Sequence, residues 1–112
     1  MNSMCFPNDV GRLLENMVFI HLKRLGKKVY YFRQTGECDF IVSQDRRVEM
    51  ITQVCYELNT DNLSREMNGL TEAMNELKFK EGYIFTFNQE NQIQKDGKTI
   101  HVVPVWKWMY QK

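Results

Sequence analysis

The strongest constraint on the fold is a segment with helical periodicity that stands between two segments with the pattern of β-strands. Residues 48–58, VEMITQVCYEL, alternate between two sets of side chains, as a strand does. Residues 82–87, GYIFTF, form a continuous apolar run of the kind found in a central strand. A strand, a helix and a strand in this order form a parallel crossover, so the sequence predicts a sheet that is at least partly parallel. The helical segment between them has apolar residues at intervals of four, three, four and three, namely Leu63, Met67, Leu70, Met74 and Leu77.

The rest of the chain supplies a second helix and more strands. From Asp9 to Leu25 apolar residues recur at helical spacing, with Asn8 or Asp9 as a cap and Gly26 as a stop. Thr60 or Asp61 is the expected cap of the later helix. The predicted order is helix, three strands, helix and two strands, a mixed central sheet flanked by helices in an α/β fold. Two other predicted strands, VYYFR and CDFIV, are joined by the turn QTGE. A last strand, TIHVV, follows the polar loop NQENQIQ and the hairpin turn KDGK, and it ends at Pro104. The segment VWKWMY after it is expected to form a cap that is helical or extended.

Length and composition fit one globular domain. The chain has 112 residues, 43% of them hydrophobic, which is enough to bury a single core. Residues 1–8 lack periodicity and are interpreted as an arm or as the remnant of a longer parent chain. Residues 9–112 are interpreted as the domain, a C-terminal fragment of a larger protein.

Charge and hydropathy exclude several classes of protein. The formal net charge is +1, so the whole chain is neither a strongly basic nucleic-acid clamp nor an acidic tail. No apolar run approaches the ~20 residues that a membrane span needs, and no signal peptide is present, so a cytoplasmic protein without membrane contact is expected. The three cysteines, Cys5, Cys38 and Cys55, lack zinc-site spacing and are expected to be reduced.

Three polar residues stand at positions where a buried element should be apolar. Asp39 and Gln53 fall on adjacent predicted strands, and Glu15 lies at the margin of the apolar stripe of the first helix. A buried carboxylate is costly unless it is paired, hydrogen-bonded or bound to a metal. If these oxygen-bearing side chains converge, they suit a hard divalent cation such as Mg²⁺. Cys55 is expected to share a strand face with Gln53.

Each of these residues also has a structural interpretation. Asp39 can form a salt bridge with Arg12 or Arg33, and Glu15 can be an ordinary charge on a helix surface. Cys55 can be a small buried apolar residue. His21 fits a core histidine better than a catalytic one.

In order and spacing, GRLLEN, ECDF and QVCYEL resemble the PD-(D/E)XK nuclease superfamily. More narrowly, the run from GRLLENMVFIHLKRLGKKVYYFR to ITQVCYEL resembles the C-terminal domain of unknown function that follows an AAA-type ATPase module in bacterial and archaeal proteins. The resemblance covers Asp9 to Phe87. It implies a restriction-endonuclease-like αβββαβ core.

The resemblance also implies roles for individual residues. Asp39 matches the acidic metal ligand of the second strand, and Glu15 matches the auxiliary glutamate of the first helix. The third strand normally carries an acidic residue, any residue and a lysine, where this chain has Gln53, Val54 and Cys55. The implied metal site, for Mg²⁺ or Mn²⁺, is therefore Asp39, Gln53 and Glu15, and the implied catalytic set adds Cys55.

The departures from the motif weaken the case for hydrolysis. Gln53 keeps an oxygen for a metal but loses the negative charge, and a thiol with a pKa of roughly 8.5 is mostly neutral at pH 7. Losing one charge-stabilising donor costs on the order of 10²–10³ in rate. Glu57, expected on the same strand face as Cys55, is a candidate replacement carboxylate. Lys23, Lys28 and Arg33 are candidates for a relocated cation and for contacts with nucleic acid, although cations at the end of a helix also suit its dipole.

Two hypotheses of function follow. The first is a degenerate nuclease-fold module that binds or regulates an AAA-type ATPase, with DNA or RNA as a further candidate ligand. The second is a Mg²⁺- or Mn²⁺-dependent nuclease with a rearranged active site. An interaction domain of the toxin or antitoxin kind is neither supported nor excluded. The sequence has no GxxxxGK[ST] motif, so the ATPase module is expected elsewhere in a parent chain or in a separate chain.

Overall fold

The computed structural model describes the backbone of residues 6–33 and 37–110, and the side chains of residues 11–31 and 40–110. The described residues form an α/β fold with one mixed sheet flanked by helices, as the sequence predicts. The elements in chain order are α1 (Phe6–Arg24), β1 (Lys28–Arg33), β2 (Glu37–Gln44), β3 (Arg47–Val54), α2 (Leu63–Leu77), β4 (Glu81–Thr86), β5 (Asn91–Lys95), β6 (Lys98–Pro104) and α3 (Val105–Tyr110).

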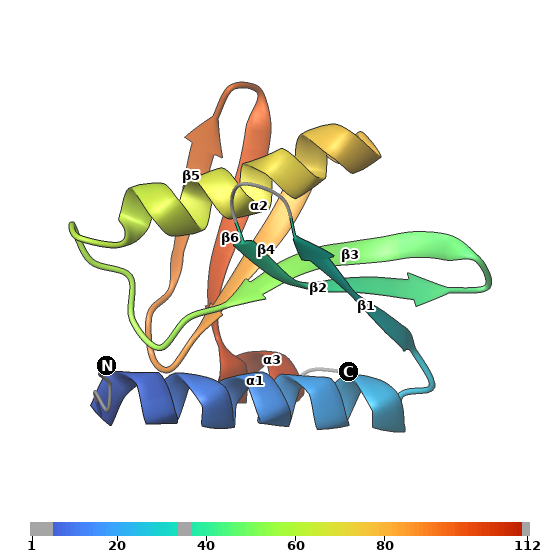
Figure 1. Cartoon of the computed structure of the whole chain (residues 1–112), viewed down its shortest axis with the longest axis horizontal. Coiled ribbons are helices and arrows are strands. Elements are labelled where there is room, and N and C mark those ends of the chain that lie inside the picture. The colour runs from blue at the N-terminus through green and yellow to red at the C-terminus, as the bar shows by residue number, and fades with distance from the viewer. Residues whose placement is uncertain (1–5, 34–36, 111–112) are drawn as a thin grey trace.

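The sheet has the strand order β1-β2-β3-β4-β6-β5. Strands β1, β2 and β3 pair antiparallel, β3 pairs parallel with β4, β4 pairs parallel with β6, and β5 pairs antiparallel with β6. The predicted parallel crossover is confirmed, because α2 connects β3 to its parallel neighbour β4. Helix α2 covers one face of the sheet, whereas α1 and α3 lie together on the other (Figure 1).

The first helix begins earlier than the sequence predicts. Helix α1 starts at Phe6, so residues 6–8 of the predicted arm are helical, and residues 1–5 lie outside the described part of the chain. The early start is compatible with Pro7, because the first N–H groups of a helix have no intrahelical partner to lose. Helix α2 covers all five predicted apolar positions, from Leu63 to Leu77, and its N-cap is Asn62 instead of Thr60 or Asp61.

One strand was not predicted. Residues 91–95, NQIQK, form β5 at the edge of the sheet, where four of the five side chains are exposed and only Ile93 is partly buried. A polar edge strand has no apolar alternation to reveal it. The hairpin turn that joins β5 to β6 places Asp96 and Gly97 at φ 53° and 77°, as the predicted KDGK turn requires.

The core has two halves, one on each face of the sheet. On the α2 face Gly82 lets β4 approach the helix closely, since an added Cβ would lie 2.7 Å from the sulfur of Met74. On the other face Trp108 of α3 stacks on Phe85 with ring centroids 4.5 Å apart. The buried residues on the α2 face are Ile41, Ile51, Met67, Leu70, Ala73, Met74, Ile84, Ile100 and Val102. Those on the α1 and α3 face are Leu14, Val18, Leu22, Phe40, Val42, Val54, Phe85 and Val105.

Candidate functional site

Gln53 is a polar side chain inside the core. Strand β3 is central, with β2 on one side and β4 on the other, and its last four residues, Ile51–Val54, are buried. Gln53 itself is 3% exposed. Burying an amide without hydrogen bonds costs about 1–3 kcal/mol, so this position is stable only if the amide finds partners.

The partner of Gln53 is Glu66, which α2 brings over this end of β3. Gln53 Nε2 donates a hydrogen bond to Glu66 Oε1, and Glu66 is 8% exposed. The other carboxylate oxygen of Glu66 lies 3.3 Å from Nη2 of Arg65, whose side chain is largely in solvent. A surface ion pair of that kind contributes little energy. The contact with Gln53 adds a buried polar link between the sheet and the helix to their apolar packing.

The amide oxygen of Gln53 is not satisfied in the same way. Among the described residues, Oε1 of Gln53 is buried and has no hydrogen-bond partner. Turning the amide group by about half a rotation exchanges its oxygen and nitrogen. One orientation leaves Oε1 unsatisfied, and the other turns Oε1 toward the carboxylate of Glu66. Two oxygen acceptors that face one another are stable only with a cation or a donor between them.

Asp39 lies beside Gln53 in the backbone of the sheet. Phe40 of β2 is the register partner of Thr52 of β3. Because the two strands are antiparallel, Asp39 and Gln53 are the next opposed positions along them. The side chain of Asp39 lies outside the described residues. Its role as a metal ligand therefore stays a prediction. Strands β2 and β3 are neighbours in the sheet, as that prediction requires.

Cys55, at the place of the motif lysine, belongs to the junction between β3 and α2. Its Sγ donates to the backbone oxygen of Glu57 at 3.3 Å and lies 3.7 Å from Nδ2 of Asn62, which also donates to that oxygen at 2.9 Å. The thiol therefore packs within a hydrogen-bonded loop.

The prediction that Glu57 lies on the face of β3 is wrong. Strand β3 ends at Val54, and Glu57 is an exposed loop residue. The side chain of Asn62 donates a hydrogen bond to the backbone oxygen of Glu57, in the loop that leads from β3 to α2. Glu57 is therefore no replacement for the missing carboxylate of the third strand.

Glu15 lies on the helix that covers the opposite face of the sheet. Its neighbours on α1, Leu14 and Val18, pack with Val54 and Phe85 on the α1 and α3 face. The pair formed by Gln53 and Glu66 lies on the α2 face instead. Glu15 is partly buried, and its role as a ligand stays a prediction.

The predicted basic residues are spread along the end of α1 and the start of β1. Lys23, in the last turn of α1, and Lys28, the first residue of β1, are both exposed. The backbone of Arg33 ends β1, and its side chain lies outside the described residues. Contacts of these residues with nucleic acid stay a prediction.

Glu66 is the residue of this site that the sequence analysis missed. It precedes Leu70 by four residues and Ala73 by seven, which places a carboxylate within the buried stripe of α2. That spacing was the available signal. The helix was interpreted from its apolar residues alone, and a glutamate in the first turn is otherwise explained by the helix dipole.

The donor set fits a hard cation better than a soft one. Among the described residues no group of three or more His, Cys, Asp and Glu side chains could hold a metal ion. Mg²⁺, however, is commonly held by one or two protein oxygens and keeps several waters. Here Nε2 of Gln53, and not its Oε1, faces the carboxylate of Glu66.

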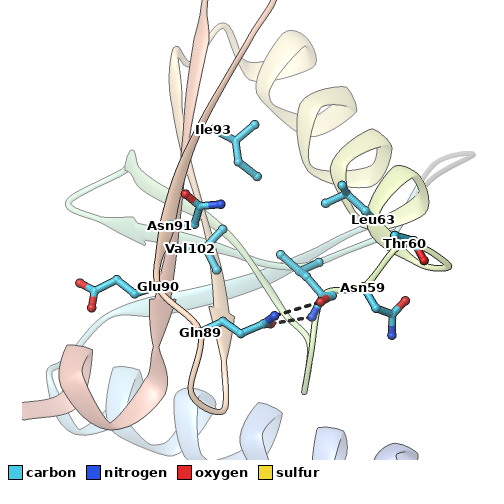
Figure 2. A pocket seen from close by; sticks show the side chains of 9 residues that line it. Asn59, Thr60, Leu63, Gln89, Glu90, Asn91, Ile93 and Val102 are labelled. Atoms are coloured by element: carbon cyan, nitrogen blue, oxygen red, sulfur yellow. Dashed lines mark hydrogen bonds between the residues drawn. The ribbon is translucent and has the colours of Figure 1, made fainter.

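A separate cleft of about 410 Å³ lies between the β3–α2 loop and the base of the β5–β6 hairpin (Figure 2). Its apolar part includes Leu63, Ile93 and Val102. Gln89 closes one end, because its side chain accepts a hydrogen bond from the backbone N–H of Leu58 at 2.7 Å and donates to the backbone oxygen of Leu58 at 2.9 Å. The polar side chains that line the cleft include the hydroxyl of Thr60 and the carboxylate of Glu90.

Comparison with known proteins places the chain within a family. Residues 10–108 match the model of a family described as "Domain of unknown function (DUF4143)". The chain is 38% identical over 117 aligned positions to "Uncharacterized protein MJ1544" of Methanocaldococcus jannaschii, and the match covers 95% of this chain. The aligned region is 26% of that protein, so the chain spans about a quarter of the relative's length. Within the described residues, no helix is long and apolar enough to cross a membrane.

Proposed function

The chain belongs to the DUF4143 family of domains of unknown function, and we propose that it is a degenerate PD-(D/E)XK nuclease-like domain that binds or regulates an AAA-type ATPase. The observation that carries the proposal is the state of the catalytic triplet. At the acidic position stands Gln53, bonded to Glu66, and at the lysine position stands Cys55, bonded within the β3–α2 loop. Both positions make internal contacts that stabilise the fold in place of a water-activating carboxylate and lysine.

The order of the elements supports the superfamily part of the proposal. Helix α1, the antiparallel strands β1 to β3, helix α2 and the parallel strand β4 follow the αβββαβ order that the resemblance requires. The triplet falls at the end of β3, beside the backbone of Asp39 on β2. A fold of this kind hosts both active and inactive members, so the site and not the fold decides the activity.

The length of the relative supports the role of a module. This chain aligns with about a quarter of the M. jannaschii protein, so the domain occurs there as one part of a longer polypeptide. The remainder of such a protein has room for a separate catalytic unit. In the proposal that unit is the AAA-type ATPase.

The outer face of α1 supports a binding role. Leu13, Met17 and Ile20 lie four and three residues apart on the helix and are 61%, 42% and 49% exposed. This spacing gives a continuous apolar row on a helix whose other face is already packed on the sheet. An apolar row of this kind suits a helix of a partner domain, and Arg12, Lys23 and Arg24 would place basic side chains beside it.

Cleavage assays test the loss of catalysis. The wild-type chain and Asp39→Ala are incubated with supercoiled plasmid, single-stranded DNA and RNA in Mg²⁺ or Mn²⁺. The proposal predicts no cleavage above a metal-free control in either protein. Cleavage by the wild type that Asp39→Ala abolishes would contradict it.

ATP hydrolysis tests the partner. The rate is measured for the full M. jannaschii relative, for the relative without its aligned region, and for that deletion with this chain added. The proposal predicts that the full protein hydrolyses ATP and that the deletion changes the rate. Leu13→Asp should weaken the effect of the added chain, whereas Asn68→Asp, an exposed position on α2, serves as the matched control. A full protein without ATP hydrolysis would contradict the proposal.

Nucleic acid binding is a further part of the proposal, and charge reversal tests it. Lys23→Glu with Lys28→Glu should reduce the binding of labelled DNA and RNA and flatten its salt dependence, since phosphate contacts dominate such binding. Lys80→Glu with Lys95→Glu makes the same change of charge at exposed positions outside this basic group and is the control. Equal binding by the wild type and the charge reversal would remove nucleic acid from the proposal.

One observation favours the second candidate, a nuclease with a rearranged site. Glu66 places a buried carboxylate beside Gln53, and Arg65 places a cation beside Glu66. These two residues could stand in for the missing acidic residue and lysine. Cleavage that depends on both Asp39 and Glu66 would select this candidate over the binding module.

A further inference from the structure

We infer that the open edge of β5, together with the cleft beside it, binds an extended peptide that adds a strand to the sheet. The peptide pairs antiparallel with β5. It carries an aliphatic side chain opposite Ile93 and an acidic side chain opposite Lys95. This surface is separate from the apolar row on α1, so the inference goes beyond the proposed function and does not depend on it.

The first step of the argument is the direction of the backbone groups of β5. The strand ends the sheet, with β6 on one side and, among the described residues, no strand on the other. The residues that flank the hairpin turn form a hydrogen-bonded pair, and such pairs alternate with unbonded ones along the ladder. The N–H of Thr99, opposite Gln94, accordingly turns away from β5 and donates to the backbone oxygen of Lys80 at 2.9 Å. Gln92 and Gln94 therefore direct their N–H and C=O groups to the open edge.

A side chain of β5 itself marks this edge as a place for an acceptor. The backbone N–H of Gln92 donates to Oδ1 of Asn91 at 2.8 Å. A neighbouring strand supplies a carbonyl oxygen at such a place. A peptide that pairs with β5 replaces the oxygen of Asn91 with its own carbonyl and bonds to both backbone groups of Gln94 as well. Antiparallel pairing is the more stable arrangement per residue, so it sets the direction of the peptide.

The second step is the aliphatic side chain. Residues directly opposite one another on paired strands share a face of the sheet, so the peptide residue opposite Ile93 lies on the α2 face. There the cleft opens between β5 and the start of α2 (Figure 2). Its apolar part includes Leu63, which is 40% exposed, and the partly buried Ile93. A valine or isoleucine of the peptide would cover these two side chains and leave water itself, which favours binding.

The third step is the acidic side chain. Lys95 and Lys98 are register partners, so two lysines stand side by side on one face of the hairpin. Like charges directly opposite one another are destabilising, whereas opposite charges stabilise a strand pair. A carboxylate on the open side of Lys95 offsets this repulsion. Glu90 is the charged residue among those that line the cleft, and it pairs with Lys107 of α3, so the middle of the peptide meets no free charge there.

Fluorescence anisotropy with the labelled peptide Ser-Glu-Thr-Val-Thr-Ser tests the inference. Its glutamate is placed opposite Lys95 and its valine opposite Ile93. N-methylation of the two threonines removes the N–H groups that donate to β5, and it should weaken binding by about tenfold or more. The peptide Ser-Val-Thr-Glu-Thr-Ser, which has the same composition, should also bind more weakly. No binding of the first peptide by the wild type, or equal binding of either control peptide, would overturn the inference.

Two substitutions in the chain test the side-chain preferences. Lys95→Glu should weaken binding of the first peptide and strengthen binding of a peptide with lysine in place of glutamate. Arg47→Glu, at an exposed position of the β2–β3 hairpin, makes the same change of charge and should alter neither. Leu63→Asp places a charge in the cleft and should weaken binding, whereas Leu25→Asp, at a leucine that is 52% exposed, is the matched control. Equal effects within either pair of variants would overturn the inference.

Hydrogen exchange separates a strand added to the edge from a ligand that fills the cleft alone. The backbone amide of Gln94 faces the open edge, whereas that of Ile93 faces β6. At a saturating concentration of the first peptide, exchange of the Gln94 amide should slow by about tenfold or more, since the amide gains an acceptor, and exchange at Ile93 should change much less. Unchanged exchange at Gln94 would overturn the inference.

Discussion

The two faces of the sheet are packed by different kinds of side chain. The face under α2 is aliphatic, is closed tightly at Gly82, and holds the buried polar pair of Gln53 and Glu66. The face under α1 and α3 has an aromatic core around Phe85 and Trp108. The buried pair of Gln53 and Glu66 keeps its geometry only if the side chains around it are fixed, and the tight packing of the α2 face fixes them. The opposite face leaves apolar side chains in solvent on α1, which suits contact with a partner.

The largest expected effect is on the aromatic face. Phe85→Ala removes a fully buried ring and its stacking on Trp108, and should lower the free energy of unfolding by about 3–5 kcal/mol. Phe87→Ala, at a position that is half exposed, should cost much less. Urea denaturation of both variants measures the difference. Similar losses would mean that Phe85 does not anchor this face.

On the α2 face, the polar pair should behave as one unit. Glu66→Ala leaves the amide of Gln53 buried without a partner and should cost about 1–3 kcal/mol. Replacing both residues by leucine should recover most of that loss, because a buried polar pair is often exchangeable for apolar residues. A double-mutant cycle by urea denaturation measures the coupling. Additive effects would show that the two side chains do not act together.

A smaller effect is expected at the cleft beside the α2 face. Gln89→Ala removes both hydrogen bonds between its side chain and the backbone of Leu58, and should cost about 1–2 kcal/mol. Hydrogen exchange of the Leu58 amide should become faster, since that N–H loses its acceptor. Unchanged exchange would mean that Gln89 does not hold the β3–α2 loop.

The smallest expected effect on stability is at the outer face of α1. Met17→Gln, at a position that is 42% exposed, should change the free energy of unfolding by less than about 0.5 kcal/mol. Thermal unfolding measures it. A large loss of stability would mean that this row of side chains serves the domain itself and not a partner.

The sequence predicts the elements whose side chains repeat with a clear period. Helix α2 and the crossover from β3 to β4 follow directly from the spacing of apolar residues. Strand β5 escapes prediction because its exposed side chains carry no alternation. The end of β3 is not predicted either, because the alternating pattern continues to Leu58 whereas the strand ends at Val54.

The site is predicted only in part for a related reason. Gln53 is conspicuous in the sequence because it interrupts a buried strand. Glu66 is thirteen residues away in the chain, and its meeting with Gln53 depends on how α2 folds back over the sheet. Glu15 is also a polar residue next to apolar positions in the sequence, yet it lies on α1, which covers the opposite face of the sheet. Contacts between elements are set by topology, which a pattern within one element does not contain.

The most direct test of a structural pair at the end of β3 observes the side-chain amide of Gln53 by nuclear magnetic resonance. The two amide protons give a pair of cross-peaks that Gln53→Glu removes, which identifies them. We predict that these protons exchange slowly with solvent in the wild type and in Glu76→Gln, because the buried carboxylate of Glu66 accepts a hydrogen bond from this amide, and that they exchange faster in Glu66→Ala. Equal exchange in all three proteins would contradict a structural role for the contact between Gln53 and Glu66.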